Sequence, residues 1–433
     1  MAPNILLIIA HDLGTHLGCH GEASVGTPVL DELAAEGARC ANHFCTAPYC
    51  SPSRGGIFTG QYPHCNGLMG LVNLGWDLPE TSATLGQMLA VAGYETYLFG
   101  LQHEVRDESR LGTRFDHVSD RSLGRSCDAV APLVVDFLDG AARENARPFY
   151  ARVGFSEVHR PYERYEADDP SSVVVPPYLA DTPGARQDLA MFQGAIRCLD
   201  SAVGHILEAL GRSGQRQNTI VVFTTDHGIA YPRAKATLYD PGLKTALILR
   251  WPERLSGGRV FKEMLSNIDL LPTLLEASGV PVPVEVQGRS FWSLLDGGRY
   301  APNEQVFAEK STTPEDVKRC IRTDRWKYIR NYRDGRLLQL PTDIEASLTR
   351  RDMGDDHLKP RPPVELYDLE SDPREQENLA GESPTEEVER NLAGRLDRFL
   401  EETGDPALRG PIPRPPEEAA LLQRARQRVT RAT

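Results

Sequence analysis

The sequence of 433 residues predicts an α/β fold in which a large, mostly parallel sheet is covered by helices on both faces. Short, continuous apolar runs at 4–10 and 219–225 are typical of central parallel strands that are buried on both faces. Segments with strand character also alternate with helical segments through about residue 300. Together these two observations favour repeated strand–helix units over an all-helical or all-strand fold.

The remaining elements follow in chain order. Thr27-Pro28 opens an amphipathic helix, because proline is favoured in the first helical turn and Leu30 and Leu33 fall on one face. By the same criteria of apolar spacing and turn residues, helices are predicted at 81–92, 129–139, 186–210 and 268–278, and strands at 95–100, 149–155 and 245–250.

The pattern changes near residue 301, where shorter strands appear. We therefore divide the chain into a large domain at 1–300, a small C-terminal α+β domain at 301–404 and a surface tail at 405–433. The small domain is expected to hold an antiparallel sheet and one helix. Its predicted parts are strands at 305–309, 320–323 and 326–331, a polar, proline-rich stretch at 341–363 and a helix at 384–402.

Composition limits the class of protein. The net charge of -13 argues against a nucleic-acid partner, which usually requires a basic surface. No apolar run reaches the roughly 18 residues that span a bilayer, and residues 1–10 lack the basic start and cleavage site of a signal peptide. The eight cysteines include no CxxC pair. We expect a cytoplasmic protein without a membrane partner. The sequence does not decide between a monomer and a homo-oligomer.

Polar residues follow four of the predicted strands directly. They are His11-Asp12, His103, His159 and Asp226-His227. Ligand sites of such sheets lie at the carboxyl ends of the strands, so these clusters are expected to meet in one crevice.

The run Cys50-Ser51-Pro52-Ser53-Arg54, followed by Gly-Gly-Ile-Phe-Thr-Gly, resembles the signature of type I sulfatases of the alkaline-phosphatase-like superfamily. The resemblance implies that a formylglycine-generating enzyme oxidises Cys50 to formylglycine. One hydroxyl of the aldehyde hydrate would attack sulfur, and the other would collapse to the aldehyde and expel sulfate. Arg54 would stabilise the modified side chain, and a helix starting after Pro52 would direct N–H groups at the anion.

The same resemblance implies one divalent cation, commonly calcium. Asp12 and Asp226 match its acidic ligands, modified Cys50 would be a third, and His11 and His227 occupy the neighbouring positions. Imidazole suits zinc or manganese better than calcium, so the metal stays open. His11 is either a ligand or a contact to the sulfate.

Gly100-Leu101-Gln102-His103 resembles the family pattern Gly-Lys-x-His, in which Lys and His contact the sulfate and the formylglycine. His103 matches, and Gln102 is predicted to contact substrate. Leu101 replaces the Lys. Either His11 supplies the missing positive charge, or turnover is slower.

His159 matches the family histidine near the leaving group and is predicted as its general acid. Arg160 is predicted to reach an anionic group of the substrate. Lys235 matches the downstream basic residue that binds sulfate, and Arg233 is the rival for that role.

Within the family, the chain resembles most closely the sulfamidase branch, the N-sulfoglucosamine sulfohydrolases. His64-x-Asn-Gly-x-Met-Gly70, His159-Arg160 and Asp226-His-Gly-Ile-x-x-Pro232 are the segments that resemble it. This implies hydrolysis of a sulfate ester or sulfamate on a small saccharide, an N-sulfoglucosamine-type amino sugar. The alternatives are a phosphonate or phosphate ester hydrolase on the same fold and a catalytically inactive sugar-binding homologue.

Overall fold

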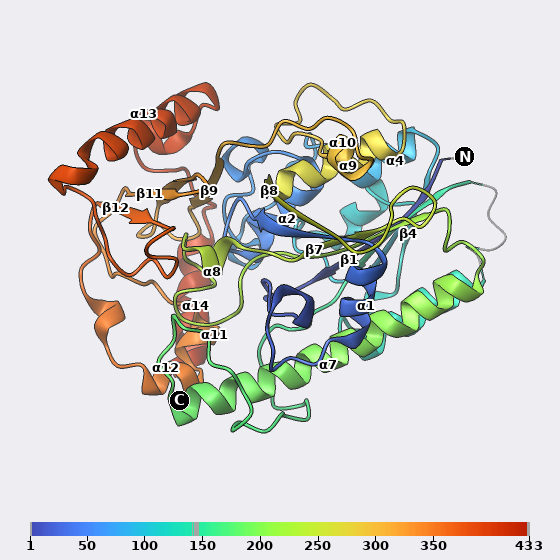
Figure 1. The fold of residues 1–433 in the computed structure, drawn as a ribbon, viewed down its shortest axis with the longest axis horizontal. Coiled ribbons are helices and arrows are strands. Elements are labelled where there is room, and N and C mark those ends of the chain that lie inside the picture. The colour runs from blue at the N-terminus through green and yellow to red at the C-terminus, as the bar shows by residue number, and fades with distance from the viewer. Residues whose placement is uncertain (1, 141, 143–146, 431–433) are drawn as a thin grey trace.

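The structure is a computed structural model that describes residues 2–140, 142 and 147–430. Its main element is an eight-stranded sheet in the order β4-β3-β5-β1-β6-β7-β2-β8 (Figure 1). In that order the strands are His117–Val118, Glu95–Gly100, Phe149–Gly154, Asn4–Ala10, Thr219–Thr225, Leu247–Arg250, Ala38–Phe44 and Arg259–Ser266.

Most neighbours in this sheet run parallel, which confirms the predicted mostly parallel sheet. The exception is β7, which is antiparallel to both β6 and β2. The central strand β1 is fully buried, as its continuous apolar sequence predicted. Its carboxyl end lies between those of β5 and β6.

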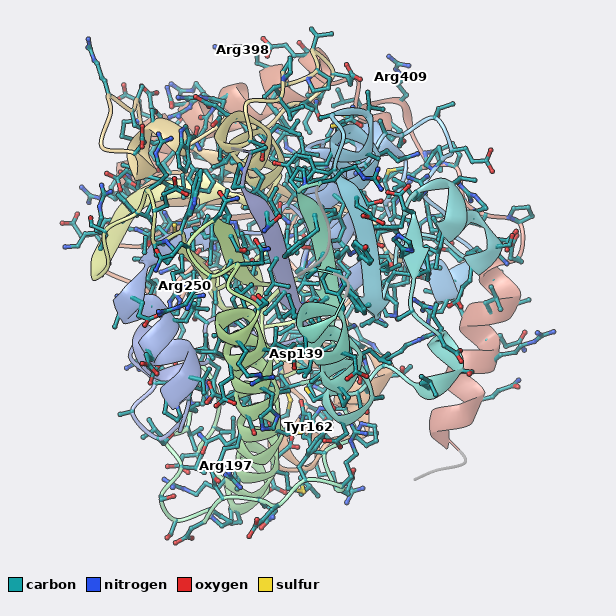
Figure 2. All side chains as sticks on the ribbon, turned by 90° about the vertical axis from the view of Figure 1, so that its right-hand side faces the viewer. Asp139, Tyr162, Arg197, Arg250, Arg398 and Arg409 are labelled. Carbon is teal, nitrogen blue, oxygen red and sulfur yellow. The ribbon has the colours of Figure 1, made fainter. Side chains whose placement is uncertain are left out.

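Helices cover both faces, and alternate residues of β1 enter two separate cores. Leu6 and Ile8 pack with α1 (Pro28–Glu36), α5 (Cys127–Asp139) and α7 (Pro183–Arg212). Figure 2 shows α5 and α7 side by side along this face. The helices on the opposite face are α2 (Cys50–Thr59), α4 (Leu85–Val91), α9 (Leu270–Ala277) and α10 (Trp292–Leu295).

A second, four-stranded antiparallel sheet follows in the order β12-β11-β10-β9, as predicted for the small domain. One face packs on Phe44 and Leu243 of the first domain, and the other is covered by α13. The strands and helix are β9 (Val306–Lys310), β10 (Lys318–Arg322), β11 (Trp326–Asn331), β12 (Val364–Asp368) and α13 (Glu386–Glu402). The domain boundaries themselves stay predictions.

Short helices complete the chain. The proline-rich stretch contains α11 (Thr342–Glu345) and α12 (Leu348–Asp352), which lie near the start of α7 (Figure 1). The predicted tail contains α14 (Glu418–Thr430), where the Glu418 carboxylate accepts a hydrogen bond from the Trp76 indole at 2.8 Å. Two further short helices are α3 (Pro63–Asn66) and α8 (Asp240–Leu243). Within the described part of the chain, no helix combines the length and apolar character that a membrane span requires.

Candidate active site

The four polar clusters lie together at the carboxyl ends of β1, β3, β5 and β6, which confirms their predicted convergence. The ring of His11 is at the centre of the group. Its centroid lies 4.8 Å from that of His159, 5.4 Å from that of His103 and 6.1 Å from that of His227. The roles assigned to these residues stay predictions.

The backbone fixes the two acidic residues. Asp12 has a left-handed conformation with φ 54°, which is uncommon for a residue other than glycine and costs free energy. Its N–H donates to Oδ1 of Asp226 at 3.0 Å, so the turn after β1 is tied to the turn after β6. Both carboxylates are fully buried.

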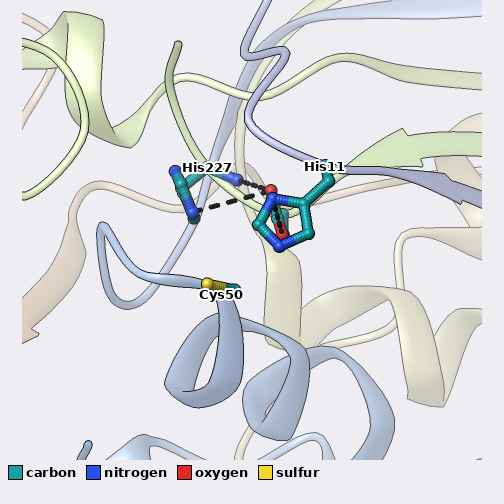
Figure 3. Close-up of side chains that lie close together, drawn as sticks. His11, Cys50 and His227 are labelled. Carbon is teal, nitrogen blue, oxygen red and sulfur yellow. Dashed lines mark hydrogen bonds and ion pairs between the residues drawn. The ribbon is translucent and has the colours of Figure 1, made fainter. Parts of the chain in front are cut away.

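Cys50 occupies the first position of α2 (Figure 3). The predicted start after Pro52 was therefore three residues late, because proline is tolerated within the first helical turn and Cys50 already has helical geometry. The ligand atoms of Cys50, His11, Asp226 and His227 all lie within 4.8 Å of one another. The first turn of a buried helix thus presents the Cys50 side chain to this cluster.

The cluster favours a charged thiolate over a thiol. Burial raises the pKa of the Cys50 thiol, but the charge of His11 and the neighbouring imidazoles of His103 and His227 outweigh burial and lower the pKa well below its usual range. Burial lowers the pKa of His11, whereas Asp226 and Asp12 raise it to about 9. The site therefore holds buried charges of both signs.

Arg54 lies in the second turn of α2, where its side chain contacts Asp226. Its Nε donates to Oδ2 of Asp226 at 3.2 Å. Its two terminal nitrogens are buried and have no hydrogen-bond partner among the described residues. Unsatisfied guanidinium donors in a buried site favour the binding of anionic oxygens.

Lys235 joins this site to the small domain. Its Nζ lies 2.7 Å from Oδ2 of Asp12 and 2.9 Å from Oδ2 of Asp343. Burial lowers the pKa of Lys235, but Asp12 and Asp343 raise it well above its usual value. Asp343, in α11, was not predicted, because the local sequence Pro341-Thr342-Asp343 signals only a helix start.

His159 lies at the mouth of the site, where its side chain is 36% exposed. Its Nδ1 is 2.6 Å from the carbonyl oxygen of Arg160, which leaves Nε2 to face the site. That Nε2 lies 3.8 Å from both Asp12 and Asp343. Burial and the charge of Lys235 lower the pKa of His159.

Three residues predicted to contact substrate already have protein partners for their side chains, and their predicted roles stay predictions. The Gln102 amide binds the backbone of 104–105. The Arg160 guanidinium forms two hydrogen bonds with Asp188, at 2.6 and 2.7 Å. Arg233 donates to the carbonyl oxygens of 374–375 and lies over the Tyr239 ring, so Lys235 occupies the site and Arg233 does not.

Comparison with protein families agrees with this geometry. The sulfatase family model matches residues 3–280. This chain belongs to the sulfatase family. A second model, for the C-terminal region of N-sulphoglucosamine sulphohydrolase, matches residues 228–346, which include Lys235 and Asp343.

Individual sulfatases match over most of the chain. An "ulvan-active sulfatase" of Formosa agariphila is 29% identical over 460 residues, covering 94% of this chain and 76% of the relative. Human "N-sulphoglucosamine sulphohydrolase" is 28% identical over 464 residues, covering 93% of this chain and 91% of the relative. These names agree with the predicted type I sulfatase family and with its sulfamidase branch.

Solved structures show the same fold. One that was determined in complex with D-glucosamine-2-N,6-O-disulfate superposes with a TM-score of 0.72, covering 94% of this chain and 99% of that chain at 19% identity. At this identity the likeness establishes the fold alone.

The metal that the sulfatase family implies fits the residues present. Asp12 and Asp226 supply carboxylate oxygens, which are common ligands of divalent cations. Nδ1 of His227 lies 2.9 Å from the Gly228 carbonyl oxygen. Its other nitrogen, Nε2, is buried, has no hydrogen-bond partner within the described part of the chain and lies 3.1 Å from Oδ1 of Asp12. Two carboxylates and an unpartnered imidazole nitrogen form a suitable donor set.

Proposed function

We propose that this sulfatase hydrolyses a sulfate ester or sulfamate of an N-sulfoglucosamine-type amino sugar, using formylglycine made from Cys50 and one divalent cation. The observation that supports this best is the close approach of Cys50 to His11, Asp226 and His227 at the strand ends. The match to the N-sulphoglucosamine sulphohydrolase C-terminal model supports the choice of an amino sugar.

Each side chain has a place in the proposed reaction. When bound, the cation, held by Asp12, Asp226 and His227, would supply positive charge against the sulfuryl oxygens, and formylglycine would supply the nucleophilic oxygen. Arg54 and Lys235 bind sulfuryl oxygens with fixed donors, and His103 orients the group. His159 donates a proton from Nε2 to the departing nitrogen or oxygen.

The proposal is tested first on the modification. Protein co-produced with a formylglycine-generating enzyme is digested, and the mass of the Cys50 peptide is measured. We expect the mass of the aldehyde or its hydrate. An unmodified thiol under these conditions would favour the inactive sugar-binding alternative.

The second test is turnover. We expect the modified protein to release sulfate from glucosamine N-sulfate and from an aryl sulfate, and Cys50→Ala to abolish both. Cys65→Ala, which changes an exposed cysteine, is the matched control and should keep activity. Faster hydrolysis of phenyl phosphonate than of any sulfate would instead favour the phosphonate or phosphate ester alternative.

A further inference from the structure

A cavity of about 560 Å³ lies beside the mouth of the active site. The loop after β5, one face of α7, and α11 with α12 form its walls. The lining residues used below are Arg160, Glu163, Asp188, Asp343 and Arg351. Small-molecule sites typically have volumes of roughly 300–1,000 Å³, so the cavity can hold a sugar ring.

Asp343 belongs to both the cavity and the active site. It lines the cavity and also accepts the 2.9 Å hydrogen bond from Lys235. Its side chain is 18% exposed, whereas Asp12, on the other side of Lys235, is fully buried. His159, which faces the same carboxylate, is also partly exposed. Asp343 thus places one carboxylate of the cavity close to both Lys235 and His159.

The walls are held in place without a ligand. Asp188 of α7 binds Arg160 through both carboxylate oxygens and accepts a 2.7 Å hydrogen bond from Thr349 of α12. One buried carboxylate thus connects the β5 loop to the small domain. Such preorganisation reduces the entropy lost when a ligand binds.

The unused groups of the cavity indicate what it binds. Glu163 and Asp343 present carboxylates, which accept hydrogen bonds from hydroxyl or ammonium groups. Arg351 is exposed and has no ion-pair partner among the described residues. The other arginine, Arg160, is neutralised by Asp188 and is not available for an anion.

We infer that this cavity is the subsite for the sugar ring that bears the reacting sulfuryl group. Asp343 accepts hydrogen bonds from the ring substituents next to the reacting position, and Arg351 pairs with a second anionic substituent, a sulfate or carboxylate. The inference rests on the proposed function. It adds that the small domain selects anionic, multiply substituted sugars over singly sulfated ones.

Binding tests the subsite without requiring turnover. In the Cys50→Ala background, the dissociation constants of glucosamine 2-N,6-O-disulfate and glucosamine N-sulfate are measured by calorimetry. We expect Asp343→Asn to weaken both sugars about tenfold or more. Arg351→Ala should weaken only the disulfate, by about fivefold. Arg390→Ala on α13, an exposed control, should change neither.

Unchanged affinity in both cavity variants would overturn the subsite, as would an equal effect of Arg351→Ala on the two sugars. Turnover of nitrophenyl sulfate by unmutated protein tests the sulfatase chemistry separately, because this compound has no sugar ring. We expect Asp343→Asn to lower kcat/KM at least tenfold more for the disulfate than for nitrophenyl sulfate. Equal losses would show that Asp343 only positions Lys235, which contradicts the inference.

Discussion

His11 lies beside both Asp12 and Cys50. Its Nδ1 lies 2.8 Å from Oδ1 of Asp12, and its Nε2 is buried without a hydrogen-bond partner among the described residues. The nearby Leu101, in place of the family Lys, is buried and contributes no charge. The imidazole of His11 can therefore act either as a metal ligand or as the positive charge that Leu101 does not supply.

Replacing His11 by an acid should change metal preference. We expect His11→Asp to bind calcium more tightly relative to zinc than the unmutated protein does, because calcium prefers oxygen ligands and zinc accepts imidazole. Metal content after equilibration with equal calcium and zinc measures this. His117→Asp changes an exposed histidine and is the control. If His11→Asp showed the same preference between calcium and zinc as the unmutated protein, residue 11 would lie outside the coordination sphere of the metal.

His159 offers a test based on the leaving group. A sugar nitrogen or oxygen must receive a proton as it departs, whereas nitrophenolate leaves without one. We expect His159→Gln to lower kcat by about 10²–10⁴-fold for an amino-sugar sulfate and by less than about tenfold for nitrophenyl sulfate. Equal losses for both substrates would remove the general-acid role and leave a binding role.

At the scale of elements, Asp188 of α7 connects the loop after β5, through Arg160, to α12, through Thr349. Removing one partner of a buried ion pair leaves the other charge uncompensated, which costs about 3–5 kcal/mol. We expect Asp188→Asn, which keeps the shape but loses the charge opposite Arg160, to lower the free energy of unfolding by about 3 kcal/mol in urea titrations.

The control for this variant lies at the start of the same helix. Asp181 pairs with Arg186 in a similar geometry, but its side chain is 56% exposed. We expect Asp181→Asn to leave the free energy of unfolding almost unchanged, because water screens exposed pairs. An equal loss of free energy of unfolding in the two variants would contradict the view that burial makes the ion pair of Asp188 important.

Some elements could be predicted from sequence and others could not, for physical reasons. The strands β1 and β6 are buried on both faces, so each is a continuous apolar run. β2 has the sequence Ala-Arg-Cys-Ala-Asn-His-Phe and is only partly buried, so it lacks that signal and was not predicted. The orientation of β7 was also missed, because its direction is set by its neighbours and not by its four residues.

At the scale of the whole molecule, His64 makes a second connection between the large domain and the small domain. His64 of α3 forms a short ion pair with Glu309 of β9, and its Nε2 lies 2.9 Å from Oγ1 of Thr403 after α13. Burial lowers the pKa of His64, but Glu309 raises it to about 10. Because the pKa of the folded state exceeds the ordinary 6.5, this stabilisation is complete below pH 6.5 and is lost as the pH rises toward 10.

This connection predicts a pH-dependent effect of mutation. We expect the free energy of unfolding of His64→Asn to fall furthest below that of the unmutated protein at pH 6. This difference in free energy should shrink by up to about 1.4 kcal/mol per pH unit between pH 6.5 and 10. Urea titrations across that range measure it, with His205→Asn, an exposed position of α7, as control. A difference independent of pH would assign His64 a packing role only.

The active site was predictable at the strand ends and not beyond them. His11, Asp12, His103, His159, Asp226 and His227 follow buried strands, so the sheet itself brings them together. Asp343 reaches Lys235 from 108 positions further along the chain, because α12, which follows α11, packs against α7. No local sequence pattern indicates such a contact, and the pairing of Arg160 with Asp188 was missed for the same reason, because Asp188 lies in another element.

The contact between Lys235 and Asp343 also bears on how such an enzyme can diversify. The groups proposed to act on sulfur sit on rigid turns after buried strands, where almost any change is costly. The groups proposed to face the sugar sit on two short helices with exposed surfaces. Substitutions there can accumulate and redirect the enzyme to a new saccharide, while the inherited sulfur chemistry is left intact.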